Sequence, residues 1–228
     1  MKKIIIICGL LGVPILVGLY AKRKFFDPRH KLEIAKNEVR ELADKNEIHN
    51  GDLIFQTSLS GQSNAIQLAT KSEYSHCGLV FRKENDIQNW FVLEAVQPVK
   101  WTPLDKWIAR GKDGHFVIKR VQGDPMIPEP MLLELRANAE KYLGKNYDLT
   151  FEWSDDKIYC SELLWKVYKT TTGIEIGQLE KLKDFDLTNE AVKKKMKERY
   201  GAKLPLNEIV ISPKSIFENT NLKTIKEN

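Results

Sequence analysis

The chain has 228 residues, of which 42% are apolar and 29% are charged, and its formal net charge is +5. This length and composition fit one well-cored globular domain with appendages and exclude a low-complexity or fibrous chain. The positive charge comes partly from basic runs at 22–24 and 193–198, which are typical of solvated helix faces, so we expect no nucleic-acid partner.

Residues 1–24 form an N-terminal segment typical of a membrane anchor or a signal. Lys2 and Lys3 precede an uncharged stretch, 4–20, which ends at a basic cluster, 22–24. The stretch is just long enough to span a bilayer, and no A-x-A-like cleavage site follows it. We therefore favour an uncleaved anchor over a cleaved signal, and we expect an exported or membrane-anchored protein of the cell envelope. Basic residues at both ends leave the orientation open.

Residues 25–48 are predicted to form an amphipathic helix, which either links the anchor to the domain or packs on it. The catalytic domain is expected at 49–228. It begins with a turn, a short strand at 53–55 and a helix near 61–72. Two strands, 75–81 and 90–96, flank a polar stretch that suits a hairpin loop, and 114–121 is a third strand candidate.

The second half of the domain is predicted to be mainly helical. After a proline-rich break, a helix covers about 131–143, and a second begins at Cys160 and ends near Gly173. A basic helix lies near 188–200. Ser212 and Pro213 are suitable first residues of a last helix. The whole pattern predicts one α+β domain with a small, mostly antiparallel sheet and helices around it.

The cysteine pattern indicates one special thiol. The three cysteines, Cys8, Cys77 and Cys160, have wide and irregular spacing, and Cys8 lies in the apolar N-terminal segment. This pattern fits neither a disulfide framework nor a zinc site, so we expect no metal and no cofactor. Cys160 stands at the start of a helix, where unsatisfied N–H groups and the helix dipole stabilise a thiolate. A small buried side chain at a helix start is the alternative interpretation.

Four histidines are candidate bases: His30, His49, His76 and His115. His30 lies beside the anchor and His49 lies in a turn, whereas His76 and His115 open apolar strands. Strand alternation puts Cys77 on the face opposite His76, which predicts a core residue.

The hairpin favours His76 because it offers a partner. If the hairpin is centred near residue 85, Gly78 pairs with Val92 and His76 with Glu94. A two-residue shift would keep Glu94 on the same face as His76, whereas a one-residue slip would not. Burying a carboxylate is costly without a partner, and a histidine across the ladder supplies one. The set predicts Cys160 as nucleophile, His76 as proton shuttle and Glu94 as the group that fixes the ring.

Five stretches of the sequence resemble a known family. They are GDLIFQTS, AIQLATKSEYSHCGLVF, FVLEAVQPVKWTPLDKWIARG, YDLTFEWSDDKIYCSELLWKVY and ISPKSIF. They closely resemble the YiiX/YaeF-like group of circularly permuted papain-fold, NlpC-like amidases, in which the histidine strand precedes the cysteine helix. The resemblance covers most of 49–217 and implies a papain-like α+β fold.

The resemblance also implies site residues. A cysteine nucleophile would match Cys160, a base His76 and the third polar position Glu94. Tyr159 and Asp52 match further family positions. Tyr159 is expected to line the pocket or to donate to an oxyanion, and Asp52 either belongs to the site or caps a turn. Tyr74 and Ser75, which flank the histidine, are weaker substrate-binding candidates.

The substrate stays open between three hypotheses. The first is hydrolysis of an amide bond in a peptide or a cell-envelope component, through a thioester acyl-enzyme. The second is a lipid-directed acyl hydrolase or acyltransferase that uses the same three residues, as in the related lecithin-retinol acyltransferase type. That hypothesis requires an apolar groove beside Cys160, for which Trp101, Trp107 and Trp153 are candidates. The third is a binding module without catalysis.

Overall fold

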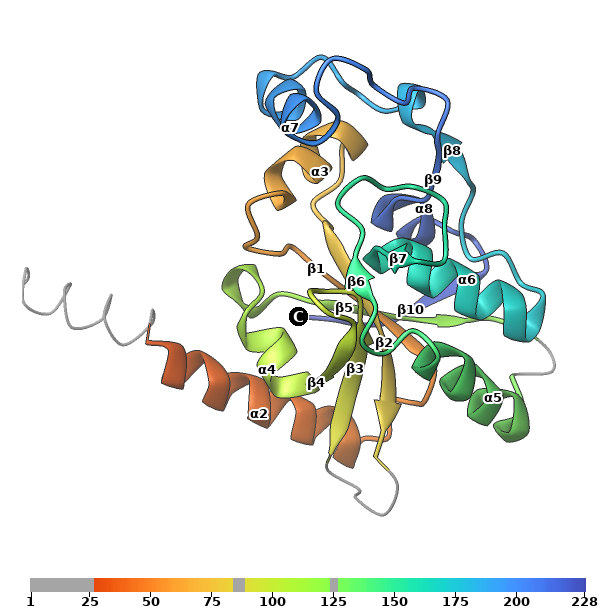
Figure 1. Ribbon diagram of the computed structural model, residues 1–228. Helices are drawn as coiled ribbons and strands as arrows, with labels where there is room; N and C mark the ends of the chain where they lie inside the picture. Colours follow the sequence, from red (N-terminus) through yellow and green to blue (C-terminus); the bar gives the residue numbers. More distant parts are fainter. Residues whose placement is uncertain (1–26, 84–88, 124–126) are drawn as a thin grey trace, which may run out of the picture.

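The computed structural model describes residues 27–83, 89–123 and 127–228. Its centre is a six-stranded antiparallel sheet with the strand order β10-β5-β1-β2-β3-β4 (Figure 1). The strands are β1 (Asp52–Gln56), β2 (His76–Arg82), β3 (Trp90–Glu94), β4 (Lys100–Pro103), β5 (Val117–Val121) and β10 (Leu222–Glu227). The expected α+β class, with an antiparallel sheet and helices around it, is confirmed.

One face of the sheet is covered by α2 (Pro28–Asp44) and α4 (Leu104–Ala109). The N-cap of α2 is Asp27, whose side chain accepts a hydrogen bond from the N–H of Arg29 at 2.9 Å. The buried residues Val39 and Leu42 of α2 pack in one cluster with Ile54 and Val80 of the sheet. Of the two roles expected for residues 25–48, the structure therefore shows packing on the domain.

The other face carries α5 (Glu129–Glu140), α6 (Cys160–Thr172) and α8 (Pro213–Phe217). Leu163 and Leu164 of α6 are followed one helical turn later by Val167, and all three are buried against the sheet. Gly173, with φ of +75°, ends α6, and the side chain of Ser212 caps α8, both as predicted. This packing fixes the first turn of α6 against β2.

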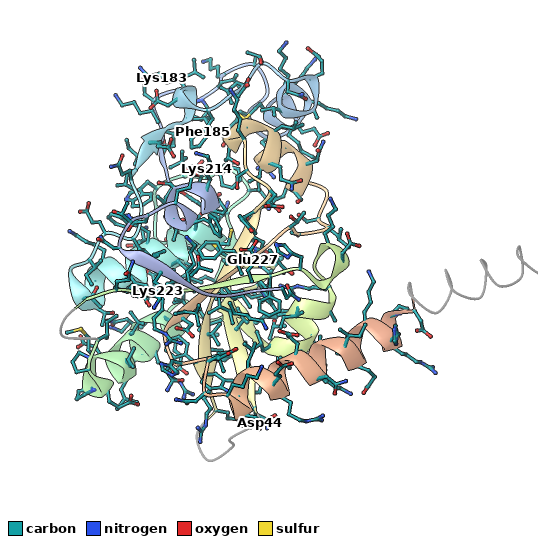
Figure 2. All side chains as sticks on the ribbon, turned by 180° about the vertical axis from the view of Figure 1, so that it is seen from behind. Asp44, Lys183, Phe185, Lys214, Lys223 and Glu227 are labelled. Carbon is teal, nitrogen blue, oxygen red and sulfur yellow. The ribbon has the colours of Figure 1, made fainter. Side chains whose placement is uncertain are left out.

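A smaller layer lies beyond one end of the sheet, where α3 (Ser63–Thr70) packs against α7 (Glu190–Tyr200). Figure 2 shows Lys183 and Phe185 at this end, seen from behind. The remaining elements are short: β6 (Asn146–Tyr147) with β7 (Lys157–Ile158), β8 (Glu180–Lys181) with β9 (Ile209–Val210), and the 3-10 turns η1 (Lys112–Gly114) and η2 (Leu182–Asp184).

Three elements of the sheet layer were not predicted from the sequence: β4, α4 and β10. The first two are only four and six residues long, too short to show a clear periodicity. The predicted N-terminal anchor, 1–24, lies outside the described residues. Within the described ranges, none of the helices combines the length and the apolar character that crossing a bilayer requires.

Candidate active site

Cys160 is the first residue of α6, and Tyr159 precedes it as the N-cap in an extended conformation (φ −108°, ψ 168°). The N–H of Tyr159 donates to the Glu162 carboxylate at 3.4 Å, which steadies the first turn. Cys160 is 2% exposed and packs among core residues of the sheet face that α6 covers. The N–H groups of this first turn have no partner inside the helix, so they create a positive electrostatic potential at the thiol.

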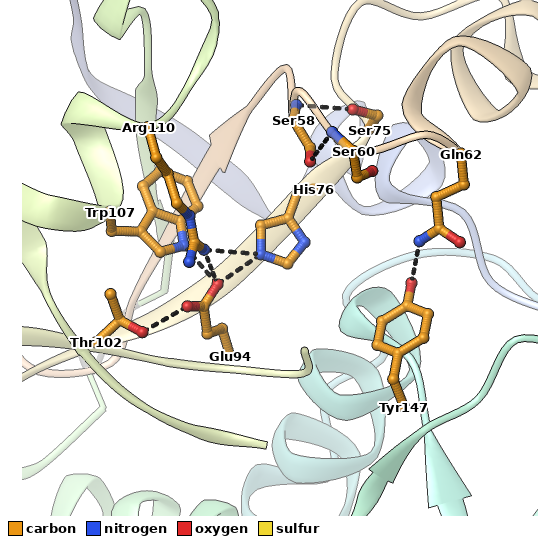
Figure 3. Close-up of polar contacts among 10 residues, drawn as sticks. All are labelled: Ser58, Ser60, Gln62, Ser75, His76, Glu94, Thr102, Trp107, Arg110 and Tyr147. Atoms are coloured by element: carbon orange, nitrogen blue, oxygen red, sulfur yellow. Dashed lines mark hydrogen bonds and ion pairs between the residues drawn. The ribbon is translucent and has the colours of Figure 1, made fainter. Parts of the chain in front are cut away.

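His76 is the first residue of β2, and its imidazole binds Glu94 of β3 (Figure 3). The distance from His76 Nε2 to Glu94 Oε2 is 2.6 Å, and both side chains are buried. With Nε2 engaged by the carboxylate, Nδ1 is the ring nitrogen that remains for Cys160. Hydrogen bonding between His76 and Cys160 affects the pKa of each residue.

The strand register differs from the predicted one by two residues. Leu79 pairs with Leu93 and Val80 with Val92, so His76 is not directly opposite Glu94. The two side chains nevertheless share a face, because a shift of two residues preserves the alternation. The predicted His76–Glu94 contact is present, as a diagonal contact instead of a directly opposed pair.

Three further side chains hold the Glu94 carboxylate. Thr102 Oγ1 donates to Oε1 at 2.6 Å, Trp107 Nε1 donates to Oε2 at 3.0 Å, and the Arg110 guanidinium donates to the same Oε2. The ring of Trp107 also stacks on the imidazole, with centroids 5.9 Å apart and planes at 25°. Glu94 is therefore fully satisfied in a buried position, and it fixes the tilt of the His76 ring.

The two residues of this pair have opposed pKa shifts. Burial would raise the pKa of Glu94, but hydrogen bonds and charge from His76 and Arg110 outweigh it and lower the pKa to about 2. Burial would lower the pKa of His76, but its interactions with Cys160 and Glu94 prevail and raise the pKa to about 9. Glu94 is thus an anion and His76 a cation near neutral pH.

Cys160 complements this charge. A hydrogen bond from Cys77 lowers the pKa of the Cys160 thiol, burial opposes this shift, and His76 lowers the pKa further, to well below that of an ordinary thiol. The predicted face for Cys77 is correct, and it is the face on which α6 lies. Cys77 is fully buried there, and burial raises its own pKa. The geometry thus supports a Cys160 thiolate beside a His76 imidazolium.

An apolar pocket opens beside Cys160, with a cavity volume of about 100 Å³. Its wall comes from α3, from α7 and from the segments 182–187 and 210–213. Apolar side chains dominate the wall, among them Ile66, Met196 and Ile211, and Tyr159 and Cys160 lie on its inner side.

Of the four predicted substrate-binding residues, the structure places only Tyr159 in this pocket. Its hydroxyl accepts a hydrogen bond from the Ile211 N–H at 3.0 Å. Ser75 is next to His76, but its hydroxyl is bonded to Ser63 at 2.6 Å and to the Ser58 N–H at 2.9 Å. Tyr74 is buried against Phe217, with ring centroids 4.2 Å apart.

Asp52 has structural partners. Its carboxylate is buried, binds the Arg120 side chain at 2.6 and 2.8 Å, and accepts from the His49 N–H at 2.8 Å. Of its two expected roles, this arrangement matches the turn-capping one. Neither Asp52 nor Tyr74 lines the pocket beside Cys160.

The candidate tryptophans and the remaining histidines lie elsewhere. Trp107 supports Glu94, Trp101 packs on Phe81, and Trp153 packs on Trp165, so none of them lines the pocket. His49 binds the Asn46 carbonyl at 3.2 Å, and His115 binds the carbonyl of Asn228 at 2.6 Å.

Several residues of the site were not singled out in the sequence. Thr102 and Arg110 hold Glu94, and Gln62 Nε2 donates to the hydroxyl of Tyr147 at 2.9 Å at the pocket wall (Figure 3). Thr102, Arg110 and Tyr147 belong to the stretches that carry the family resemblance, which was the available signal. Glu162, two residues after the nucleophile, is fully buried.

Comparison with known proteins decides the family. A family model described as permuted papain-like amidase enzyme, YaeF/YiiX, C92 family, matches residues 47–226. The chain belongs to this permuted papain-like amidase family. It is 49% identical over 176 residues to the uncharacterized protein YiiX of Escherichia coli (strain K12), a match that covers 77% of this chain and 84% of YiiX.

A solved structure supports the same assignment. The crystal structure described as metalloprotein yiiX from Escherichia coli O157:H7 superposes with a TM-score of 0.75 at 46% identity. The match covers 80% of this chain and 98% of that one. The papain-like fold expected from the resemblance is therefore confirmed. Membership of the C92 amidase family also supports a function of the cysteine-hydrolase type.

Proposed function

We propose that this family member hydrolyses an amide bond with Cys160 as nucleophile, His76 as acid and base, and Glu94 as the group that orients the imidazole. The observation that carries the proposal is the arrangement of the site: Cys160 begins α6 at the pocket, and the Glu94 carboxylate binds the His76 imidazole at 2.6 Å. The pKa shifts agree with it, lowered at Cys160 and raised to about 9 at His76. Together they favour a thiolate–imidazolium pair at neutral pH, which is the reactive form of a cysteine hydrolase.

In the proposed reaction the Cys160 thiolate attacks the amide carbonyl carbon, and the carbonyl oxygen takes up the negative charge. When the C–N bond breaks, the His76 imidazolium gives its proton to the leaving amine, and a thioester to Cys160 remains. Neutral His76 then takes a proton from a water molecule, whose oxygen attacks the thioester and releases the acid and the thiolate. Glu94 stays ionised throughout and holds the imidazole.

We infer two donors for the oxyanion. One is the backbone N–H of Cys160 at the start of α6. The other is the hydroxyl of Tyr147, which lines the pocket with Cys160. Because Gln62 donates to the Tyr147 oxygen, the phenolic hydrogen is directed elsewhere and is available to a substrate oxygen.

The YiiX protein of the solved structure is described as a metalloprotein. In the described part of this chain, no group of three or more His, Cys, Asp or Glu side chains is arranged to hold a metal ion. Moreover, both oxygens of Glu94 and the Nε2 of His76 are already engaged with protein partners. The residues that the structure describes do not fit a metal, and no step of the proposed mechanism uses one.

A second candidate function is acyl hydrolysis or acyl transfer on a lipid with the same three residues. The apolar pocket beside Cys160 favours it, since a peptide stem offers little apolar surface to such a wall. Attachment to the cell envelope through residues 1–24 belongs to both candidates. A binding module without catalysis would keep its function in Cys160→Ala, which separates it from both.

The first test is the reactivity of the thiol. The full chain is labelled with short pulses of iodoacetamide from pH 4 to 9, and Cys160 and Cys77 are read separately by peptide mass. We expect Cys160 to react well below pH 8 and to lose this reactivity in His76→Ala, after which amide and ester panels identify the scissile bond. A Cys160 that behaves as an ordinary buried thiol would refute the mechanism. Activity that a chelator removes would count against it as well.

A further inference from the structure

Within the described part of the chain, one of the two cations that line the pocket beside Cys160 has no anionic partner. Arg199 of α7 is half-buried in the pocket wall and, among the described residues, forms no ion pair with any carboxylate. Lys195, one turn earlier at the same pocket, is already paired with Glu198 at 2.5 Å. A half-buried guanidinium in a mostly apolar wall is costly unless something compensates its charge.

The guanidinium is held in place. It lies over the ring of Phe151 with 4.8 Å between the guanidinium carbon and the ring centroid, and it donates to Gln62 Oε1. Stacking and a single hydrogen bond leave other N–H groups of the fork unused. Both contacts orient Arg199 without neutralising it.

The Phe151 ring, over which Arg199 lies, belongs to the loop before α6. The buried carboxylate of Asp148 accepts from the Thr150 N–H at 2.8 Å and from the Glu152 N–H at 2.6 Å. Phe151, which lies between Thr150 and Glu152 in the sequence, has φ of +51°. This backbone conformation is unfavourable in free energy for a bulky residue. This conformation places its ring between Arg199 and Tyr159, whose ring centroid is 5.0 Å away.

Two hydrogen bonds lead from Arg199 toward the part of the pocket that holds the nucleophile. Arg199 donates to Gln62, Gln62 donates to Tyr147, and Tyr147 lines the same pocket as Cys160. An anionic group bound by Arg199 would therefore lie in the same pocket as the reacting carbonyl, and the apolar wall would cover the carbon chain between them.

From this arrangement we propose that Arg199 is the anion-binding residue of the substrate pocket. The preferred acyl group then combines an apolar chain with a negatively charged group, a carboxylate or a phosphate, that pairs with Arg199. This inference names the substrate class of the site and rests on the proposed function of Cys160. It applies to both candidate functions, amide hydrolysis and acyl hydrolysis or transfer on a lipid, because Arg199 would bind the acyl side of the scissile bond.

Protection of Cys160 against iodoacetamide tests the inference without turnover. The full chain is labelled in the presence of n-alkanols, n-alkanoates and monoalkyl phosphates of six to eight carbons. We expect at least one anionic series to protect Cys160 at a concentration about tenfold or more below that of the alkanol of equal length. Which series protects better distinguishes a carboxylate substrate from a phosphate one. Equal protection by the alkanols, or no protection by either anion, would overturn the proposal.

Variants of α7 separate a specific pair from general attraction by a basic helix. Arg199→Met should remove the preference for anions, Arg199→Lys should retain part of it, and the matched control Lys195→Met should keep it. A preference that survives Arg199→Met, or that falls equally in Lys195→Met, would refute the role of Arg199. Each variant is compared with its own labelling rate without ligand. A Cys160 that lacks low-pH reactivity in the free enzyme marks instead a failure of the proposed function.

Discussion

His76 reaches Glu94 along a diagonal of the β2–β3 ladder, with 2.6 Å between Nε2 and Oε2. The carboxylate acts on the imidazole in two ways. It accepts a hydrogen bond from the Nε2–H and so fixes the orientation of the ring, and, together with Cys160, it raises the pKa of His76 to about 9 against the effect of burial. Thr102, Trp107 and Arg110 hold the carboxylate itself. The first prediction separates the two effects of Glu94 from each other.

Glu94→Gln keeps the shape of the side chain and removes its charge. The thiolate–imidazolium form exists above the pKa of Cys160 and below that of His76, so activity should fall on the alkaline side near pH 9 in the wild type. Without the carboxylate, the pKa of His76 decreases and this alkaline limb should move to lower pH. The rate should fall by less than the roughly 10⁴-fold that a tautomer-fixing carboxylate can contribute.

The measurement is kcat/KM from pH 5 to 10 for the wild type and for Glu94→Gln, with Cys160→Ala as the inactive reference. His76→Ala should be almost as inactive as Cys160→Ala. An unchanged alkaline limb in Glu94→Gln would contradict the electrostatic effect of Glu94. A loss as complete as that of Cys160→Ala would contradict its orienting role.

The absence of a side chain at Gly78 allows β2 and β3 to lie close together next to the His76–Glu94 contact. A Cβ at this position would lie 2.2 Å from Val92 Cγ1 and 3.1 Å from the Leu93 carbonyl oxygen. Gly78→Ala should therefore push β2 and β3 apart next to Glu94 and destabilise the protein by about 1–3 kcal/mol. Urea unfolding measures this loss. The double variant Gly78→Ala/Val92→Ala relieves the closest contact and should unfold at a higher urea concentration than additivity of the two single losses predicts; additive losses would show that the contact does not decide the effect.

Cys77 should tune the nucleophile. Its hydrogen bond is the largest influence that lowers the pKa of the Cys160 thiol. Cys77→Ala keeps a small apolar side chain in the core and removes the S–H donor, so the pKa of Cys160 should rise. The pH at which iodoacetamide labels Cys160 at half its maximal rate should move upward, while unfolding changes little. A labelling profile identical to that of the wild type would show that Cys77 only fills the core.

Tyr147→Phe tests the proposed oxyanion donor. The variant keeps the ring in the pocket wall and removes the hydroxyl that Gln62 orients. Loss of one such donor typically lowers kcat by about 10²–10³-fold, and we expect KM to change far less. Tyr200→Phe is the matched control, because its hydroxyl donates to the Thr150 carbonyl at 2.5 Å and does not line the pocket. Equal kcat in Tyr147→Phe and the control would exclude Tyr147 as a donor.

The sequence was sufficient to place Glu94 with His76, because strand alternation has a period of two and tolerates a register shift of two residues. Alternation also placed Cys77 on the correct face, but it could not show that α6 covers that face. The helix start at Cys160 and its end at Gly173 follow local rules of capping, which depend on near neighbours alone.

The support of Glu94 and the pocket could not be predicted in the same way. Thr102, Trp107 and Arg110 meet Glu94 only because β4 and α4 fold back over β3, and both elements are too short for a periodic signal. The pocket joins α3, α7 and the start of α6, which are far apart in the sequence. In the sequence, nothing distinguishes Arg199 from the other cations of a basic helix. Only the packing of α3 against α7 brings it beside Gln62.

Glu162 provides the last prediction, because it is a fully buried carboxylate two residues after the nucleophile. Burial raises its pKa to about 7, although Lys166 at 2.9 Å and the Tyr159 N–H lower it in part. An unfolded glutamate has a pKa of about 4.3. The folded state therefore binds the proton more tightly, and its stability falls as pH rises from about 4.3 through about 7.

Glu162→Gln removes this titration and keeps an oxygen for the Tyr159 N–H. The melting temperature of the wild type should therefore decrease relative to that of Glu162→Gln between pH 4.5 and pH 8, by an amount that corresponds to at most about 3 kcal/mol. Glu175→Gln is the control, since that carboxylate is exposed and pairs with Lys169 at the surface. If the difference in melting temperature between the wild type and Glu162→Gln is the same at both pH values, Glu162 does not titrate in this window, and burial does not control its proton.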